Sequence, residues 1–391
     1  MTIEVMGVEV VNKGAHLMLL AVLEQIRSRF PSARIAVTPR RGRLEYSDYS
    51  PLRMYGKVRN KRLELSWGPF RDSVSPTRRD MYGLVGEKDI NVLLDASGFA
   101  LGDQWGASKA EKRADEFERM KRNGTRIILL PQAFGPFTSQ RIRRAVKRIV
   151  KASDLVFARE RESFAHLADT AGSNDKISVA PDFTCLLSLH EPQTYVEATE
   201  KRLCIIPNEQ NVKRAAQEEG KAYKRFLAWL SEYAVDSGLV PVYLIHEGVG
   251  DRRLADMAIL DSGVEAQVVE YEDPMTLKRF IGESYVLVTG RYHGLVSGLC
   301  QGVPSLATSW SHKYELLLQD YGVQDGLLNP ADDPIEWRRA LDFNSDPENN
   351  SLIRHGLLNH AAIHATAATK MWAEVLDFME SHRLSRSGNR R

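Results

Sequence analysis

An arginine and a histidine two positions apart form the strongest candidate for a reactive site in this sequence. Residues 286–304 begin with an apolar strand pattern, continue with Arg291, Tyr292 and His293, and then predict a helix from about Gly294. This order places a guanidinium, an imidazole and free helical N–H groups at one point, as in an anion site. The guanidinium matches carboxylate or phosphate oxygens, and imidazole suits proton transfer near neutral pH. We therefore favour an anion-binding acid/base site over a helix cap with an ion pair.

A second pair of arginines follows a predicted strand in the first half of the chain. Arg159 and Arg161 come directly after the apolar residues 155–157, and Ser163 opens the next helical pattern. Because glutamates alternate with these arginines, a solvated run of salt bridges explains the pattern as well as an anion site does.

Polar or glycine-containing turns follow several other predicted strands. Glycine lets a ligand approach the backbone closely, and doubly wound sheets bind ligands beyond the carboxyl ends of their strands. The candidate substrate-binding residues are Asn12, Lys13, Gly14, Asp95, Ser97, Gly98, Gln132, Gly135, Tyr292, Gly294 and Lys313. A lone lysine such as Lys313 is more often a plain surface residue.

Short apolar segments alternate with helical patterns along almost the whole chain, and these elements must position the candidate residues. The predicted strands are 3–8, 35–38, 92–94, 127–130, 155–157, 203–206, 240–245, 286–288 and 305–308. The predicted helices are 17–26, 108–121, 139–151, 223–235, 252–261, 294–301, 313–321 and 361–380. Such alternation is typical of parallel α/β units. We predict an α/β fold with two tandem Rossmann-like domains facing a cleft.

Length and composition suggest the domain boundaries. The chain has 391 residues, which at about 150 residues per domain predicts two or three domains. We predict an N-terminal Rossmann-like domain (1–187), a polar linker (188–201), a C-terminal Rossmann-like domain (202–330), C-terminal helices (331–380) and a disordered basic tail (381–391).

Charge, cysteines and missing motifs exclude several classes of protein. Lys and Arg number 53 against 51 Asp and Glu, so a general nucleic-acid binder is not expected. Three scattered cysteines predict neither a disulfide framework nor a zinc module. The dinucleotide and P-loop glycine motifs do not occur. Without a signal-peptide pattern or a membrane-spanning apolar run, a cytoplasmic protein is expected.

The segment 39–79 carries a marked local excess of positive charge. It holds eleven Lys and Arg against four Asp and Glu, a local charge of +7, with aromatic residues interspersed and no clear periodicity. Such a segment is either a long solvated loop or a lid on the acceptor side. A lid of this kind would meet an anionic acceptor, such as a diphosphate-linked lipid sugar at the membrane surface.

These motifs, taken in order, resemble the polysaccharide pyruvyl transferase family. No single piece is specific, but the ordered set over about residues 5–325 is. The shared pieces are Asn12-Lys-Gly-Ala15, Asp95-Ala-Ser-Gly98, Pro131-Gln-Ala-Phe-Gly-Pro136, Ala158-Arg-Glu-Arg-Glu-Ser163, Ala180-Pro-Asp182, Arg291-Tyr-His-Gly294, Gly302-Val-Pro304 and Lys313. The resemblance implies a GT-B-like arrangement of the two domains.

The resemblance also implies a reaction. A pyruvyl group would pass from phosphoenolpyruvate to two sugar hydroxyls of a cell-surface polysaccharide or its lipid-linked precursor, forming a pyruvate ketal. Arg159 and Arg291 would bind the phosphate and carboxylate of the donor, and His293 would be the acid/base. The chemistry demands no metal or other cofactor. The enzyme would work in the cytoplasm, with the inner face of the membrane as one place to meet its acceptor.

Two other functions stay open at this point. A nucleotide-sugar glycosyltransferase would use the same GT-B architecture, because one fold hosts many chemistries. A non-catalytic glycan- or anion-binding relative is the other, since His16 stands where the family often has an acidic residue. Thermal stabilisation of the protein by nucleotide sugars but not by phosphoenolpyruvate would favour the glycosyltransferase. Binding of phosphoenolpyruvate without release of phosphate would favour the non-catalytic relative.

Overall fold

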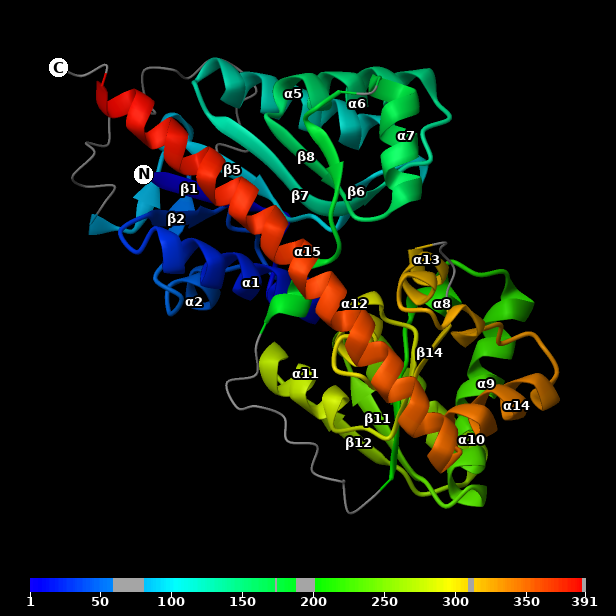
Figure 1. The fold of residues 1–391 in the computed structure, drawn as a ribbon. Coiled ribbons are helices and arrows are strands. Elements are labelled where there is room, and N and C mark those ends of the chain that lie inside the picture. Colours follow the sequence, from blue (N-terminus) through cyan, green and yellow to red (C-terminus); the bar gives the residue numbers. More distant parts are fainter. Residues whose placement is uncertain (59–80, 173, 188–200, 309–312, 389–391) are drawn as a thin grey trace. The chain divides into compact units, whose positions relative to one another are not determined.

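The chain forms two compact units, each built on its own parallel sheet (Figure 1). This computed structural model describes residues 1–58, 81–172, 174–187, 201–308 and 313–388. Unit 1 comprises Met1–Val10, Met18–Phe183 and Ala367–Arg391, and unit 2 comprises Val11–Leu17 and Thr184–Thr366. The predicted boundaries at 187 and 202 would make the two units consecutive in sequence. The structure shows that they are not. An N-terminal segment belongs to unit 2 and a C-terminal segment to unit 1.

The sheet of unit 1 has the strand order β4-β3-β2-β1-β5-β7-β8-β9, with β6 beside β7, and these pairings are parallel. The order reverses between β1 and β5, the place where doubly wound sheets bind ligands. The strands are β1 (Thr2–Met6), β2 (Arg34–Val37), β3 (Tyr55–Lys57), β4 (Leu84–Val85), β5 (Val92–Asp95), β6 (Phe99–Leu101), β7 (Arg126–Phe134), β8 (Leu155–Ala158) and β9 (Ile177–Val179).

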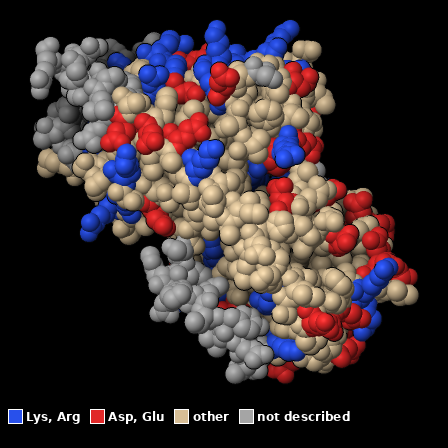
Figure 2. Space-filling model, in the orientation of Figure 1, with Lys and Arg blue, Asp and Glu red and all other residues tan. Residues whose placement is uncertain are grey.

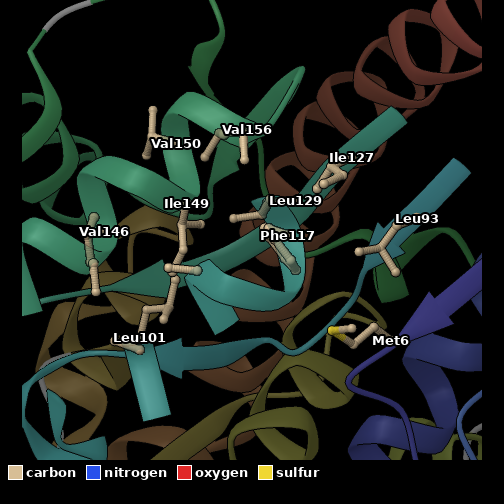
Figure 3. Packing of buried hydrophobic residues seen from close by; sticks show 14 of the residues in the cluster. Met6, Leu93, Leu101, Phe117, Ile127, Leu129, Val146, Ile149, Val150 and Val156 are labelled. Carbon is tan, nitrogen blue, oxygen red and sulfur yellow. The ribbon is translucent and has the colours of Figure 1, made fainter. Parts of the chain in front are cut away.

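Helices cover this sheet and bury a core of aliphatic side chains against it. On α6, apolar residues recur at helical spacing, so Val146, Ile149 and Val150 share one buried face. Figure 3 shows these side chains in one cluster with Phe117 of α5 and Leu129 of β7. The helices of unit 1 are α1 (Lys13–Arg29), whose first turn lies in unit 2, α2 (Tyr46–Tyr49), α5 (Ala107–Arg122), α6 (Gln140–Ala152) and α7 (Arg161–Ala171).

The outer faces of α5 and α6 carry charges of both signs. Arg141 pairs with Glu111 at 2.8 Å, and Arg148 pairs with Glu118 at 2.7 Å. Figure 2 shows Lys, Arg, Asp and Glu side chains mixed over these helices at the top of the view. Exposed pairs of this kind contribute about 0–1 kcal/mol each, so this surface adds little to the stability of unit 1.

The basic segment 39–79 is structured where it is described. Arg40 and Leu44 form an isolated antiparallel bridge, α2 follows, and β3 joins the sheet beside β2. Lys57 is buried with its ammonium 2.7 Å from the carboxylate of Glu4, so it adds nothing to exposed positive charge. The prediction of one long loop is wrong here, because a three-residue strand leaves no periodic pattern. Residues 59–80 lie outside the described residues, and the lid stays a prediction.

The sheet of unit 2 has the parallel strand order β12-β11-β10-β13-β14-β15. Its order reverses between β10 and β13, so the residues after these two strands flank the expected binding position. The half-exposed edge strand β12 is not predicted from the sequence, because its polar ends hide the apolar pattern. The strands are β10 (Arg202–Ile206), β11 (Val240–Ile245), β12 (Gln267–Glu270), β13 (Val286–Thr289), β14 (Ser305–Thr308) and β15 (Leu327–Leu328).

The helix α11 shows how the sequence defines where a helix of this unit begins. The side chain of Asp273 accepts hydrogen bonds from the backbone N–H groups of Met275 and Thr276 and so caps α11, with Pro274 at the first helical position. The helices of unit 2 are α8 (Gln210–Lys213), α9 (Gln217–Asp236), α10 (Gly248–Ser262), α11 (Pro274–Gly282), α12 (Tyr292–Leu299), α13 (Lys313–Asp320) and α14 (Pro334–Ser345).

The last helix, α15 (Pro347–Gly388), is longer than the sequence pattern predicts. It begins in unit 2, and from Ala367 onward it belongs to unit 1, where Trp372 packs edge-on against Phe183. The helix includes residues 381–388, for which we predicted disorder, because the sequence has neither Gly nor Pro between Gly356 and Gly388. The predicted linker lies outside the described residues except for Lys201. Of the helices described, none is both long and apolar enough to cross a bilayer.

Candidate functional site

The predicted arginine–histidine turn lies where the strand order of unit 2 reverses. β13 ends at Thr289 and α12 begins at Tyr292, two residues earlier than expected, with Arg291 as the N-terminal cap residue. From the segment after β10, the side-chain amide of Asn208 donates a hydrogen bond to the carbonyl of Gly290 at 2.6 Å. This bond ties the ends of β10 and β13 together and fixes the start of the turn.

Two carboxylates of the same unit hold the guanidinium of Arg291. Asp251 accepts hydrogen bonds from Nε at 3.0 Å and from Nη2 at 2.6 Å, and Glu247 accepts one from Nη1. Burial alone would lower the pKa of Arg291, but the negative charges of Asp251 and Glu247 outweigh burial and raise this pKa. The sequence led us to expect an arginine open to a substrate anion, whereas the structure places its charge in an ion-pair network.

Asp251 connects three of the segments that follow strands. Its fully buried carboxylate also accepts hydrogen bonds from the backbone N–H groups of Glu209 at 3.0 Å and Glu247 at 3.1 Å. Glu209 follows β10, Glu247 follows β11 and Arg291 follows β13. The carboxylate of Asp251 therefore holds the polar edge of the sheet in one arrangement.

Replacing Asp251 with asparagine is expected to lower the free energy of unfolding by about 3–5 kcal/mol, because it leaves the buried charge of Arg291 poorly compensated. Urea unfolding measures this loss. Asp256 on the same helix forms an exposed pair with Arg252 at 3.0 Å, and its replacement with asparagine should cost less than about 1 kcal/mol. Equal losses in the two variants would contradict the role given to Asp251.

The imidazole of His293 lies against the first turn of α1, and a glycine makes this approach possible. A Cβ atom built on Gly14 would lie 2.2 Å from Nδ1 and 2.7 Å from Cγ of His293, closer than two such atoms can come. Both residues belong to unit 2. The structure thus brings together the first and one of the last family motifs, whose residues Gly14 and His293 are 279 positions apart in the sequence.

The neighbours of Gly14 position this first turn. The side chain of Asn12 accepts a hydrogen bond from the backbone N–H of Ala15 at 3.1 Å, so Asn12 caps α1. The ammonium of Lys13 donates to the carbonyl of Glu272 at 2.7 Å. Burial lowers the pKa of Lys13, which the acidic residues after β12 partly offset. A half-buried lysine therefore directly precedes the glycine against which the imidazole of His293 lies.

Aromatic residues complete the surroundings of the turn. The rings of Tyr292 and His293 meet edge-on with centroids 5.6 Å apart, and Tyr292 meets Tyr314 in the same way. The ammonium of Lys313 lies 5.0 Å from the centroid of the Tyr292 ring, a cation–π contact. A Cβ on Gly294 would lie 2.8 Å from Oγ1 of Thr289, so this glycine serves close packing of α12 on the sheet.

A second histidine, His246, follows β11 and is almost completely buried. Neither of its ring nitrogens has a hydrogen-bond partner among the described residues. Burial lowers the pKa of His246 well below 6.5, and the charges of Arg291, His293 and Lys13 lower it further. The ring is therefore neutral at physiological pH, with one N–H donor and one acceptor nitrogen.

His246 should make the free energy of unfolding depend on pH below about 6.5, its usual pKa. In that range the unfolded chain binds a proton on this residue and the folded chain does not. Stability that is present above pH 6.5 is therefore lost as the pH falls, by about 1.4 kcal/mol per unit from this residue. Urea unfolding between pH 5 and 7.5 measures the slope. A His246→Leu variant with the slope of the wild type would contradict this origin.

The candidates Asp95, Ser97 and Gly98 lie in unit 1, around the end of β5. Asp95 is buried, accepts a hydrogen bond from the backbone N–H of Ser97 at 3.2 Å, and pairs with Arg113. Gly7 has φ +84°, and a Cβ on it would lie 2.3 Å from Oγ of Ser97. The turn that ends at Gly98, with φ +65°, thus packs onto the end of β1, where the strand order reverses.

The remaining first-half candidates gather at the ends of β7 and β8. Arg159 is buried, and its Nη1 lies 3.2 Å from a carboxylate oxygen of buried Asp182. Its backbone N–H donates to the carbonyl of Gln132 at 3.0 Å. A Cβ on Gly135 would lie 2.4 Å from Cδ2 of His166, so this glycine provides space for a ring. Arg159 thus pairs with a family-motif aspartate and, more distantly, with Glu160, whose carboxylate lies 4.0 Å from its Nε.

The structure therefore distributes the predicted site residues over two units. Unit 2 contains Asn12, Lys13, Gly14, Arg291, Tyr292, His293, Gly294 and Lys313, and unit 1 contains Asp95, Ser97, Gly98, Gln132, Gly135 and Arg159. Sequence reasoning missed Asn208, His246, Glu247 and Asp251. The first three could have been found, because each stands within two residues of a strand end. Asp251 lies on α10, and only the fold shows that it meets Arg291.

Solved structures with this fold are enzymes of the GT-B type, and two α/β units with parallel sheets place this chain in the same fold class. A complex of Staphylococcus aureus MnaA with UDP is 12% identical, with TM-score 0.57 over 97% of this chain and 96% of that one. Anabaena HepE in complex with UDP-glucose is 11% identical, with TM-score 0.58 over 96% and 99%. At such identities the similarity shows the fold alone. No protein with a curated description matches the chain by sequence.

The sequence profile of the family "Polysaccharide pyruvyl transferase" matches residues 12–312. The match covers more than three quarters of the chain and begins and ends near Asn12 and Lys313, the first and last of the predicted site residues. The chain belongs to the polysaccharide pyruvyl transferase family, and the resemblance inferred from the ordered motifs is confirmed.

Proposed function

We propose that this protein transfers the pyruvyl group of phosphoenolpyruvate to two hydroxyls of one sugar, in a cell-surface polysaccharide or its lipid-linked precursor. The family match over residues 12–312 carries the proposal. The close approach of His293 to Gly14 supports it, because both belong to family motifs and lie together in unit 2. The acceptor would be met in the cytoplasm or at the inner face of the membrane.

The reaction needs two proton transfers from sugar hydroxyls. The first hydroxyl oxygen bonds to C2 of phosphoenolpyruvate, and its proton is delivered to C3, which becomes a methyl group. The second hydroxyl oxygen then bonds to C2 as the bond from C2 to the phosphate oxygen breaks, and its proton leaves with the phosphate. The products are a pyruvate ketal and inorganic phosphate. We assign both transfers to His293, because imidazole can accept and return a proton near neutral pH.

The donor carries up to three negative charges and needs a cationic site. In unit 2, the ammonium groups of Lys13 and Lys313 and the first N–H groups of α12 can supply it. Because Asp251 and Glu247 compensate the charge of Arg291, we propose that Arg291 positions the turn that bears His293 rather than binding the donor as its main cation. Arg159 is paired with Asp182. By the same reasoning it positions the segment that follows β8.

A thermal-shift comparison tests which donor the site takes. Phosphoenolpyruvate should raise the Tm in a concentration-dependent way, and UDP-glucose and UDP-N-acetylglucosamine should not. The nucleotide sugars are the right comparison, because structures of the same fold hold UDP or UDP-glucose. A rise in Tm with the nucleotide sugars alone would favour a glycosyltransferase. Binding of phosphoenolpyruvate without phosphate release on any acceptor would favour a non-catalytic relative.

A further inference from the structure

We propose that His246 is a second ligand-contacting imidazole of the His293 site, donating a hydrogen bond to an oxygen of the bound oxyanion donor. The naming of that donor as phosphoenolpyruvate rests on the proposed function. The contact itself rests on the position of His246, on its burial and on its hydrogen bonding.

The hydrogen bonding of His246 points to a partner outside the described residues. Only 3% of its surface is exposed, and neither ring nitrogen has a hydrogen-bond partner among the described residues. Buried polar groups in folded proteins are nearly always hydrogen-bonded, because an unpaired one keeps the full cost of losing water. A histidine with a purely structural task at this place would be expected to donate to a carbonyl or carboxylate of the fold.

The position of His246 leads to the same site. It follows β11 directly, one residue before Glu247, which pairs with Arg291. The charged groups that act on its ring are Arg291, His293 and Lys13, which come from the end of β13, the start of α12 and the start of α1. These are the residues around which we place the donor. His246 therefore lies at the carboxyl end of β11, within the electrostatic reach of the groups that would surround an anion.

A neutral imidazole suits this place. The cations around the site oppose a further positive charge, so the ring keeps one N–H and one lone pair. The N–H can donate to a phosphate or carboxylate oxygen of the donor, and the other nitrogen can accept from a hydroxyl. His246 would thus orient the donor without adding charge, whereas His293 moves protons.

Three variants separate a ligand contact from a structural role. His246→Leu removes both hydrogen-bonding nitrogens, while His246→Asn and His246→Gln each keep one donor and one acceptor. Without ligand, the leucine variant should have an unchanged or higher Tm at pH 7.5, because it removes a buried polar group that the fold does not satisfy. Its Kd for phosphoenolpyruvate, measured by calorimetry, should rise roughly 10- to 100-fold. One of the two amide variants should recover most of the affinity. His355→Leu, at an exposed site on α15, is the control and should change neither quantity.

Titration of ¹⁵N-histidine-labelled protein gives a readout that does not depend on turnover. The His246 ring signals, assigned with the asparagine variant, should shift when phosphoenolpyruvate or inorganic phosphate is added. Shifted signals without phosphate release on any acceptor would refute the proposed function and keep the contact. Phosphate release with unshifted His246 signals, or with an unchanged Kd in the leucine variant, would overturn the contact and keep the function. Unshifted signals with both oxyanions and no turnover would refute both.

Discussion

Replacing His293 with alanine should lower kcat for phosphate release from phosphoenolpyruvate by roughly 10²- to 10⁴-fold, the range that a positioned acid/base supplies. Donor binding should change by only a few-fold, because the cationic groups around the turn are untouched. A steady-state assay with purified variant and wild type, read as kcat and KM separately, measures both effects.

The side chain of a neighbouring residue provides the control for this variant. Tyr292→Phe keeps the ring that meets His293 at 5.6 Å and removes only the hydroxyl, so kcat should stay within a few-fold of the wild type. Wild-type kcat in the His293→Ala variant would remove this imidazole from the mechanism.

Replacing Gly14 with alanine should lower kcat by about 100-fold, although the change adds one methyl group in a helix. The new Cβ would lie 2.2 Å from Nδ1 of His293, so either the imidazole or the first turn of α1 must move. A displacement of about 1 Å in a catalytic group is enough for a loss of this size. The steady-state assay measures it, and the crystal structure of the variant should show the displaced ring.

A second glycine on a helix separates the clash from a general effect of the substitution. A Cβ on Gly356 of α15 meets no atom within 4 Å. Gly356→Ala should therefore leave kcat unchanged and stabilise the protein by about 0.5–1 kcal/mol. If Gly14→Ala retained full activity, the close contact between Gly14 and His293 would have no part in catalysis.

The alternation of apolar segments and helical patterns predicts most of this fold, because buried parallel strands are nearly continuous apolar runs. It fails where burial is partial or a strand is very short. The edge strand β12 is half exposed, and β3 has three residues with a buried lysine that only the fold pairs with Glu4. The N-terminal segment Val11–Leu17 belongs to unit 2 and the C-terminal segment Ala367–Arg391 to unit 1. This division depends on packing between residues far apart in sequence, such as Trp372 and Phe183, which no local pattern encodes.

The candidate site could be predicted as a set of residues but not as a set of contacts. The strand-end rule directs attention to Arg291 and His293. It gives no sign that Asp251, in the first turn of α10, compensates the arginine, or that Gly14 serves the imidazole rather than a ligand. Charge in a sequence indicates which residues can bind an anion, and only their partners in the fold determine which of them are available for it.

The central claim is that phosphoenolpyruvate loses its phosphate as a ketal forms on a sugar. The most direct test incubates the pure protein with phosphoenolpyruvate and a range of bacterial glycans and lipid-linked oligosaccharides, and follows phosphate release and product NMR together. We expect one acceptor to give phosphate and a pyruvate ketal in equal amounts, with the ketal bonded to two oxygens of one sugar. Intact phosphoenolpyruvate with every acceptor, alongside transfer of a sugar from a nucleotide sugar, would contradict the claim.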